Sequence, residues 1–392
     1  MKEGWTYKKL REVCNYSIGL TYKPVDVCSD GTIVLRSSNI QNEMLDLNDV
    51  VRVNSPIKES LFVQKGDILM CSRNGSARLV GKVAMIPETK ERMTYGTFMM
   101  VIRGEYNPFL LYFFKSDVFR KQIKHGEANM INQITRYMLD DVVVGLPPVS
   151  DLKRIVERLD SAFENIDKLK ANAEKQLAEA RILFQKSLAK AMEPKEGWEE
   201  KALKELGMTQ TGTTPSKNDK ENYGDFIPFI RPSEIDYDDC GNIDYNSEIK
   251  LSEKGLSAGR LFKKGSILMV CIGATISKVG FVTQDVSCNQ QINVLTPKKE
   301  YYYKFIYYAM RNKEFKDKVI KEGTSSQATL PIINKGKWER LTISLPPLAV
   351  QQRIAERLDS LSENVRKYEE IQRQIISECD ALKQALLRKV FE

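Results

Sequence analysis

The sequence predicts an α+β protein built from two mixed α/β domains, each followed by one long helix. Three observations support this fold class: an internal repeat, short strand-like runs in both halves, and a heptad pattern after each half. The segment LPPVSDLKRIVERLDSAFEN at 146–165 returns as LPPLAVQQRIAERLDSLSEN at 345–364, with twelve of twenty positions identical. A repeat at this spacing indicates two equivalent structural units within one chain.

The length, composition and charge of the chain fit a globular protein with two domains. Its 392 residues can form two cores, and its 42% hydrophobic content is that of a folded protein. The formal charge of +8 is a moderate basic excess, compatible with a phosphate-bearing partner. No apolar run is long enough to span a membrane and no signal peptide is visible at Met1, so we expect a soluble, cytoplasmic protein with no membrane partner.

The cysteine and histidine content argues against several kinds of site. Seven scattered cysteines form no C-x-x-C pair, which disfavours a disulfide framework. The single histidine, His125, lies in the polar segment KHGEAN, where a solvated surface residue is expected rather than a member of a catalytic triad. With one histidine and no paired cysteines, we expect neither a metal site nor a cofactor.

Short apolar runs bounded by Gly, Pro, Asn or Ser predict strands in both halves. In the first domain (1–147) they lie at 32–35, 67–70, 82–86, 98–102 and 142–144, and one helix is expected from about 107 to 124. In the second domain (194–346) they lie at 226–230, 267–271, 280–283, 292–295 and 341–344, with a helix near 301–321. We expect a largely antiparallel sheet in each domain.

Two further blocks align between the halves. KEGW at 2–5 returns at 195–198 with an offset of 193. GDILMCSRNGSARLVGKV at 66–83 matches GSILMVCIGATISKVGFV at 265–282 with an offset of 199. The segments between these blocks scarcely align, which predicts a common scaffold with divergent loops.

Each domain is followed by a predicted spacer helix, at 148–193 and at 347–392. A Pro-Pro pair marks each start, because proline is disfavoured inside a helix. Apolar residues recur at heptad spacing in both helices, with a local shift in the first helix after Ala173. Since an isolated helix would expose this seam, we expect an intramolecular antiparallel coiled coil with pseudo-twofold symmetry. The alternative is that each helix packs on its own globular domain.

The repeated segments resemble the DNA-specificity (S) subunit of type I restriction-modification systems over essentially the whole chain. The resemblance rests on the duplicated LPP…RI.ERLD segments, the GDILM and GSILM blocks, TGTTPS at 211–216, IPFIRPSEI at 227–235 and NQQIN at 289–293. It implies two target recognition domains, no catalytic activity of the subunit itself, and assembly with two methyltransferase (M) subunits and with restriction (R) subunits. The first copy has CNYSIGLTYKP at 14–24 and YGT at 95–97 where the second has TGTTPS and NQQ, so the two domains are expected to recognise different DNA sequences.

Two unlike domains joined by rigid helices are expected to recognise a bipartite, asymmetric target in double-stranded DNA and to direct the M and R subunits to it. Cations near phosphates supply affinity, and side chains that reach base edges supply specificity. The expected DNA-binding residues are Arg36, Arg73, Asn74, Arg78, Asn132, Gln133 and Arg136 in the first domain, and Thr214, Ser216, Lys217, Arg231, Thr275, Ser277, Lys278, Gln290, Gln291, Ser325 and Gln327 in the second. The alternative for each is a solvated loop residue or a turn former, and Arg36 and Arg231 could equally pair with a carboxylate.

Charged positions that recur in both helices form a second candidate surface. They are Arg154, Glu157, Arg158 and Asp160, matched by Arg353, Glu356, Arg357 and Asp359. We expect them to dock one M subunit per half, because two equivalent sites suit two equivalent partners. The alternative is a solvated helical face with local ion pairs.

Two other functions stay open. An enzyme acting on DNA is disfavoured, because no N-P-P-Y, D-P-P-Y or phosphate-loop motif is present, and the acidic residues Asp236, Asp238 and Glu248 occur in one copy only. The other alternative is a coiled-coil scaffold that binds only proteins. The basic charge and the divergent polar loops favour DNA binding over such a scaffold.

Overall fold

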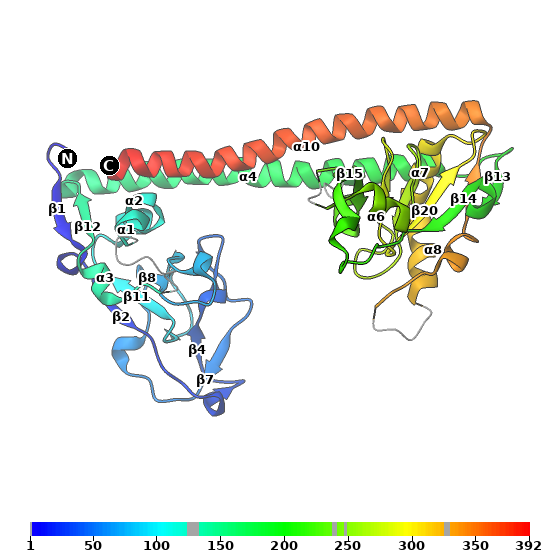
Figure 1. Cartoon of the computed structure of the whole chain (residues 1–392). Coiled ribbons are helices and arrows are strands. Elements are labelled where there is room, and N and C mark those ends of the chain that lie inside the picture. Colours follow the sequence, from blue (N-terminus) through cyan, green and yellow to red (C-terminus); the bar gives the residue numbers. More distant parts are fainter. Residues whose placement is uncertain (1, 124–132, 237–240, 247–248, 325–329) are drawn as a thin grey trace. The chain divides into compact units, whose positions relative to one another are not determined.

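The chain folds into two compact units, each containing one globular domain and a stretch of both long helices (Figure 1). The computed structural model describes residues 2–123, 133–236, 241–246, 249–324 and 330–392. The first unit comprises residues 1–172 and 375–392, and the second comprises residues 173–374. The division therefore falls inside the helices and not at the Pro-Pro pairs.

The described residues of the first unit form two four-stranded sheets. One has the order β2 (Asn15–Ile18), β11 (Met99–Arg103), β8 (Ile68–Cys71), β9 (Val83–Met85), and all its pairs are antiparallel. The other has the order β10 (Met93–Tyr95), β4 (Thr32–Leu35), β7 (Val51–Val53), β3 (Val27–Cys28), with β10 and β4 parallel. Smaller antiparallel pairs join β1 (Thr6–Lys9) to β12 (Val143–Leu146) and β5 (Ile40–Gln41) to β6 (Met44–Leu45). The largely antiparallel arrangement expected for this domain is confirmed.

The second unit repeats this plan. The sheet β14 (Gly207–Thr211), β20 (Ile292–Pro297), β17 (Ile267–Val270), β18 (Val279–Phe281) is antiparallel and has the same order as β2-β11-β8-β9. A three-stranded sheet has the order β16 (Lys250–Leu251), β15 (Tyr223–Ile230), β19 (Ser287–Cys288), with β15 and β19 parallel. The strand β13 (Glu199–Ala202) pairs with β21 (Thr342–Leu345) as β1 does with β12. Short helices complete the domains: α3 (Arg136–Asp140) in the first, and α5 (Leu203–Leu206), α6 (Glu253–Ala258) and α9 (Lys335–Trp338) in the second.

The strand β8 is apolar throughout because both of its faces are covered. Successive side chains of a strand point to opposite faces. Ile68 and Met70 belong to the cluster that contains the aromatic residues of the neighbouring helix, whereas Leu69 and Cys71 belong to the cluster formed with the second sheet. All four side chains are fully buried. The same arrangement holds for β17, which explains why both strands are continuous apolar runs in the two halves.

Each single helix expected after the central strands is in fact two helices. The first domain has α1 (Asn107–Lys115) and α2 (Asp117–Ile123), and the second has α7 (Tyr303–Arg311) and α8 (Lys313–Thr324). The chain is extended at Ser116, where ψ is 151°, and at Asn312, where ψ is 143°. The Ser116 hydroxyl accepts a hydrogen bond from the Phe119 amide at 3.2 Å, so it caps the start of α2. The prediction of one continuous helix was wrong at these two residues.

The strand register shows how the halves align. Ile68 pairs with Ile102, 34 positions later (102 − 68), whereas Ile267 pairs with Leu295, 28 positions later (295 − 267). From these partners to the Leu of each LPP segment, the first domain has 44 positions (146 − 102) and the second has 50 (345 − 295). Relative to the first domain, the second domain therefore has six fewer residues between the paired strands and six more residues between the later strand and the LPP segment. These two differences cancel, so the offset is 199 at β8 and again at the LPP segment.

The long helices α4 (Val149–Met192) and α10 (Leu348–Phe391) run antiparallel in each unit. In the first unit, Lys170 pairs with Asp380 at 2.7 Å and Lys383 pairs with Asp167 at 2.6 Å. In the second unit, Arg181 pairs with Glu369 at 2.9 Å. As the residue number of the α4 partner rises, that of its α10 partner falls, so the predicted antiparallel pairing is confirmed.

The helices also pack on the globular domains, so the two arrangements considered from the sequence occur together. In the first unit, Leu159 and Phe163 of α4 form a cluster with Tyr112 of α1. In the second unit, Ala355 and Leu358 of α10 belong to the main domain core, and Phe184 and Leu188 of α4 join the same core. Other expected seam residues behave differently: Leu169 and Leu382 are 52% and 48% exposed, since lysine stems occupy the helix contact at this level.

Candidate DNA-binding surfaces and helix faces

The loop after β8 in the first domain brings several predicted residues together. The amide of Arg73 donates to the Phe98 carbonyl at 3.1 Å, and Arg73 forms an antiparallel bridge with Gln133. The Arg73 guanidinium lies over the Phe98 ring, 5.5 Å from its centroid. Arg73 and Gln133 are exposed, and Phe98 is 54% exposed. No described carboxylate lies within ion-pair distance of the exposed Arg73 side chain.

Asn74 links this loop to the turn that follows β4. Its amide nitrogen donates to the Ser37 hydroxyl at 3.1 Å. Exposed cations lie on nearby elements: Arg78 in the short 3-10 helix Ala77–Leu79, and Arg136 at the start of α3, 5.8 Å from the Tyr16 ring centroid. Of the predicted residues that the structure describes, Arg73, Arg78, Gln133 and Arg136 are exposed and lie on loops or short helices.

Arg36 and Arg231 occupy equivalent turns, and both pair with a carboxylate. The Arg36 guanidinium lies 3.2 Å from Asp49, and its own amide donates to the Asn39 side chain at 2.8 Å. The Arg231 amide donates to Glu234 at 2.7 Å, and its guanidinium forms a second contact with the same carboxylate at 2.5 Å. The scaffold alternative considered for these two arginines matches this geometry.

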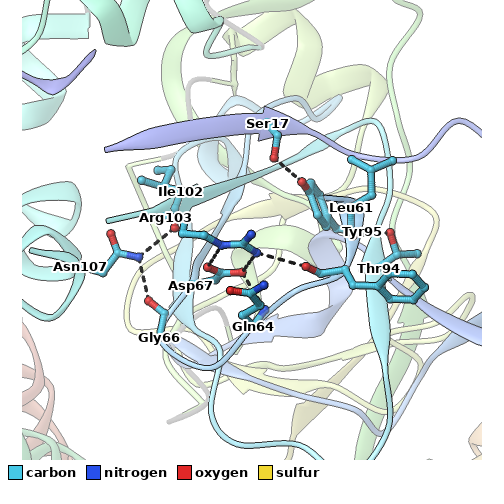
Figure 2. A network of polar contacts seen from close by, with 11 residues as sticks. Ser17, Leu61, Gln64, Gly66, Asp67, Thr94, Tyr95, Ile102, Arg103 and Asn107 are labelled. Carbon is cyan, nitrogen blue, oxygen red and sulfur yellow. Dashed lines mark hydrogen bonds and ion pairs between the residues drawn. The ribbon is translucent and has the colours of Figure 1, made fainter. Parts of the chain in front are cut away.

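An ion pair with a buried carboxylate joins β11 to the residue before β8 in the first domain (Figure 2). Arg103 on β11 binds Asp67 through two parallel hydrogen bonds of 2.7 and 2.6 Å, and Asp67 is only 2% exposed. Asn107, at the start of α1, donates to the carbonyls of Gly66 and Ile102 at 2.7 and 2.9 Å. These contacts fix the start of β8 against β11 and α1.

The second domain replaces this ion pair with two hydroxyls. Main-chain pairing matches Asp67 to Ser266 and Arg103 to Thr296. The Ser266 and Thr296 hydroxyls lie 2.8 Å apart. Because both members of the pair change together, each domain keeps a satisfied polar contact at this position.

A glycine allows the same close chain crossing in both domains. A Cβ atom at Gly212 would lie 2.2 Å from the Asn289 carbonyl oxygen, and one at Gly19 would lie 2.1 Å from the Tyr95 carbonyl oxygen. The next amide donates across the crossing in each case, over 2.9 and 2.7 Å. The segment at 14–24, which departs from TGTTPS in sequence, therefore has the same backbone path at this point. The shared signal is a glycine at the offset of 193 that also relates the KEGW blocks.

Polar side chains of the second domain gather at the Gly212 crossing. The Thr214 hydroxyl donates to the Gln290 side chain, and the Asn289 amide donates to Gln291 at 3.1 Å. Gln290 and Gln291 are exposed. Ser216 and Lys217 are exposed on the loop that follows. Among the described residues, more of the second domain's predicted base-contacting side chains lie near this crossing than at the turn after β17.

Three predicted residues lie on the turn between β17 and β18. Thr275 is exposed, and Lys278 is half-buried with its ammonium 3.4 Å from the Asp236 carbonyl oxygen. Ser277 is 7% exposed and has a φ of 73°, so it forms the turn and offers little surface to DNA. Other residues considered from the sequence lie outside the described part of the chain: His125, Asn132, Asp238, Glu248, Ser325 and Gln327.

The recurring charged residues of the helices divide into two groups. Asp160 accepts a hydrogen bond from the Tyr112 hydroxyl, and Asp359 accepts one from Tyr308 at 2.8 Å. Burial, together with this hydrogen bond, raises the pKa of the Tyr308 hydroxyl far above its ordinary range. The two aspartates therefore hold each helix on its own domain. The other six side chains are exposed: Arg154, Glu157, Arg158, Arg353, Glu356 and Arg357.

The helix pair of the second unit carries an apolar groove of about 620 Å³. Leu183 of α4 and Val365 of α10 lie in its lining, and Glu179 and Lys186 lie at the same site. Leu183 is 58% exposed, and the adjacent Ile182 is 53% exposed. Within the residues described, no helix is long and apolar enough to cross a membrane, and no three His, Cys, Asp or Glu side chains converge as metal ligands would.

The chain thus has two domains of one fold with different exposed polar side chains, each joined to a long helix. The family model of the type I restriction modification DNA specificity domain matches residues 2–179 and 195–375. These two matches cover most of the chain, so the chain belongs to this family.

Individual relatives agree with the family match. The StySPI specificity subunit of Salmonella potsdam is 25% identical over 100% of this chain and 89% of its own length. The EcoKI specificity subunit of Escherichia coli K12 is 31% identical, but that match covers 44% of this chain and 39% of the relative.

Solved structures share the fold. A chain from a study of complex assembly and conformational transition in the type I R-M system superposes with a TM-score of 0.78 at 19% identity, over 100% of this chain and 98% of that one. The HsdS subunit from Thermoanaerobacter tengcongensis gives a TM-score of 0.55 at 18% identity, over 99% and 97% of the two chains.

Proposed function

We propose that this subunit recognises a bipartite, asymmetric target in double-stranded DNA, with one domain contacting each half. The observation that carries the proposal is the combination of matched backbones with unlike side chains. The two domains share strand order, glycine crossing and helix attachment, yet present Arg73, Asn74 and Gln133 in one and Thr214, Gln290 and Gln291 in the other. Side chains that differ on one scaffold are suited to different base sequences.

In this proposal the subunit performs no chemistry and directs its partners to the target. Methyltransferase subunits supply methylation, and restriction subunits join the assembly. The exposed Arg154, Glu157 and Arg158, with Arg353, Glu356 and Arg357, are proposed to dock one methyltransferase per half. The apolar groove beside Leu183 extends this docking surface in the second unit, because its charged edge and apolar lining suit one face of an amphipathic helix of that partner.

Methylome sequencing of cells that express the subunit with its methyltransferase tests the proposal. We expect methylation within a motif of two specified parts separated by unspecified base pairs. A single uninterrupted motif, or methylation by the purified subunit without its partner, would contradict it.

The scaffold alternative is separated by DNA binding. The complex of this subunit with its methyltransferase should bind duplexes that contain the motif, and the affinity should fall steeply as the salt concentration rises. Lysine and arginine side chains release counterions from the DNA phosphates on binding, and this release is less favourable at high salt. If the methyltransferase alone bound the same duplexes with the same sequence preference, the subunit would be only a scaffold.

A further inference from the structure

The two domains place different side chains at the same backbone positions beside the central strand. Arg73 is bridged to Gln133 in the first domain, and Ile272 is bridged to Ile332 in the second. Both bridges relate positions separated by 199, the offset of the β8 and β17 blocks. Ile272 and Ile332 therefore stand where the first domain has a guanidinium and an amide.

The third matched position completes this contrast. Phe98 directly precedes β11, and Gln291 directly precedes β20. The Phe98 ring, 54% exposed, lies beneath the Arg73 guanidinium at 5.5 Å, whereas no aromatic side chain occupies the matched place in the second domain. A ring face fixes the plane of a guanidinium and leaves its N–H edge available for two parallel hydrogen bonds.

We propose that Arg73 recognises a guanine in the half-target contacted by the first domain, with Phe98 as the positioning residue. This assignment rests on the proposed function. Guanine presents O6 and N7 as adjacent acceptors in the major groove, which match the two donors of an arginine edge. Arg36 is directed to Asp49 instead, whereas Arg73 has no described carboxylate partner. At the matched positions the second domain has the aliphatic Ile272 and Ile332, so it makes no equivalent guanine contact there.

The test uses the complete complex of subunit and methyltransferase on duplexes of the methylated motif. Each guanine is replaced in turn by 7-deazaguanine, which lacks the N7 acceptor. One replacement, in one half only, should weaken binding by the wild-type complex roughly tenfold, since a bidentate contact contributes about 1–3 kcal/mol of discrimination. The Arg73→Ala complex should show no further loss at that guanine, and the Phe98→Ala complex should show a reduced loss.

Arg78→Ala is the matched control, because Arg78 is an exposed cation on the same loop. It should weaken binding to all duplexes about equally and keep the full 7-deazaguanine effect. The assignment is overturned if no guanine replacement weakens wild-type binding, or if Arg73→Ala still shows the full loss. A wild-type complex with no two-part motif would instead refute the proposed function, so the two failures are distinguishable.

Discussion

At the scale of single residues, Asp67 shows how strongly one domain depends on a contact that the other lacks. Its buried carboxylate is paired with Arg103. We predict that Arg103→Thr lowers the free energy of unfolding of the first domain by about 2–3 kcal/mol, because a buried carboxylate loses its partner. Adding Asp67→Ser creates the hydroxyl pair of the second domain and should recover part of that loss. Chemical denaturation checks this, and a double variant less stable than Arg103→Thr alone contradicts it.

Glu234 predicts a pH dependence in the second domain. Burial alone would raise its pKa, but hydrogen bonds from Arg231 and Ser233 hold the pKa below the ordinary value of 4.5. The charged Glu234 carboxylate therefore stabilises the folded domain at pH values above the ordinary pKa. This stabilisation is lost as the pH falls through the lowered pKa of the folded state. Glu234→Gln should therefore be less stable than wild type at pH 7, with the difference shrinking below pH 4.5. Denaturation curves at several pH values measure this difference in the free energy of unfolding. If the difference stays the same from pH 7 to below pH 4.5, the pKa of Glu234 is not lowered in the folded domain.

Residue types on the candidate surfaces could be predicted from the sequence, whereas their partners could not. Arg36 and Arg73 are both arginines after strands, yet only Arg36 meets a described carboxylate, because its turn directs it toward Asp49. Phe98 is not among the predicted site residues, since an aromatic residue directly before a buried strand gives no signal of exposure. The roles of Tyr112 and Tyr308 depend on contacts about fifty residues away, which no local pattern shows.

At the scale of structural elements, both domains share the close chain crossing at Gly19 and Gly212, although the sequences around these two glycines differ. We predict that Gly19→Ala and Gly212→Ala each lower the free energy of unfolding by about 2–3 kcal/mol, because a Cβ would collide with a backbone oxygen that cannot move freely. Gly75→Ala is the control, since a Cβ added there would meet no atom within 4 Å beyond its chain neighbours. Thermal unfolding of the three variants measures this loss of stability. If Gly212→Ala were as stable as Gly75→Ala, the chain crossing would not require a glycine.

The elements that could be predicted are those with a strong local pattern. β8 and β17 are continuous apolar runs, and α4 and α10 combine a proline start with heptads. β2 and β14 are polar segments, NYSI and GMTQT, and they are recognisable as strands only through their pairing with β11 and β20. The breaks at Ser116 and Asn312 escape prediction because the apolar period continues across them.

At the scale of the whole molecule, the long helices are predicted to set the spacing between the half-targets. One heptad inserted after Asn172 in α4, with one inserted before Ile375 in α10, lengthens both helices by about 10 Å. Since a base pair spans about 3.4 Å along the duplex, the unspecified gap of the methylated motif should grow by about three base pairs. Methylome sequencing measures the gap, and an unchanged gap would show that the helices do not set it.

The central claim is that each globular domain recognises its own half-target independently of the other. The most direct measurement is methylome sequencing with a chain in which residues 195–346 also replace residues 2–147, both long helices being kept. The prediction is a two-part motif in which both parts carry the sequence that wild type shows in the second domain's half. A motif that keeps both original halves would contradict the claim.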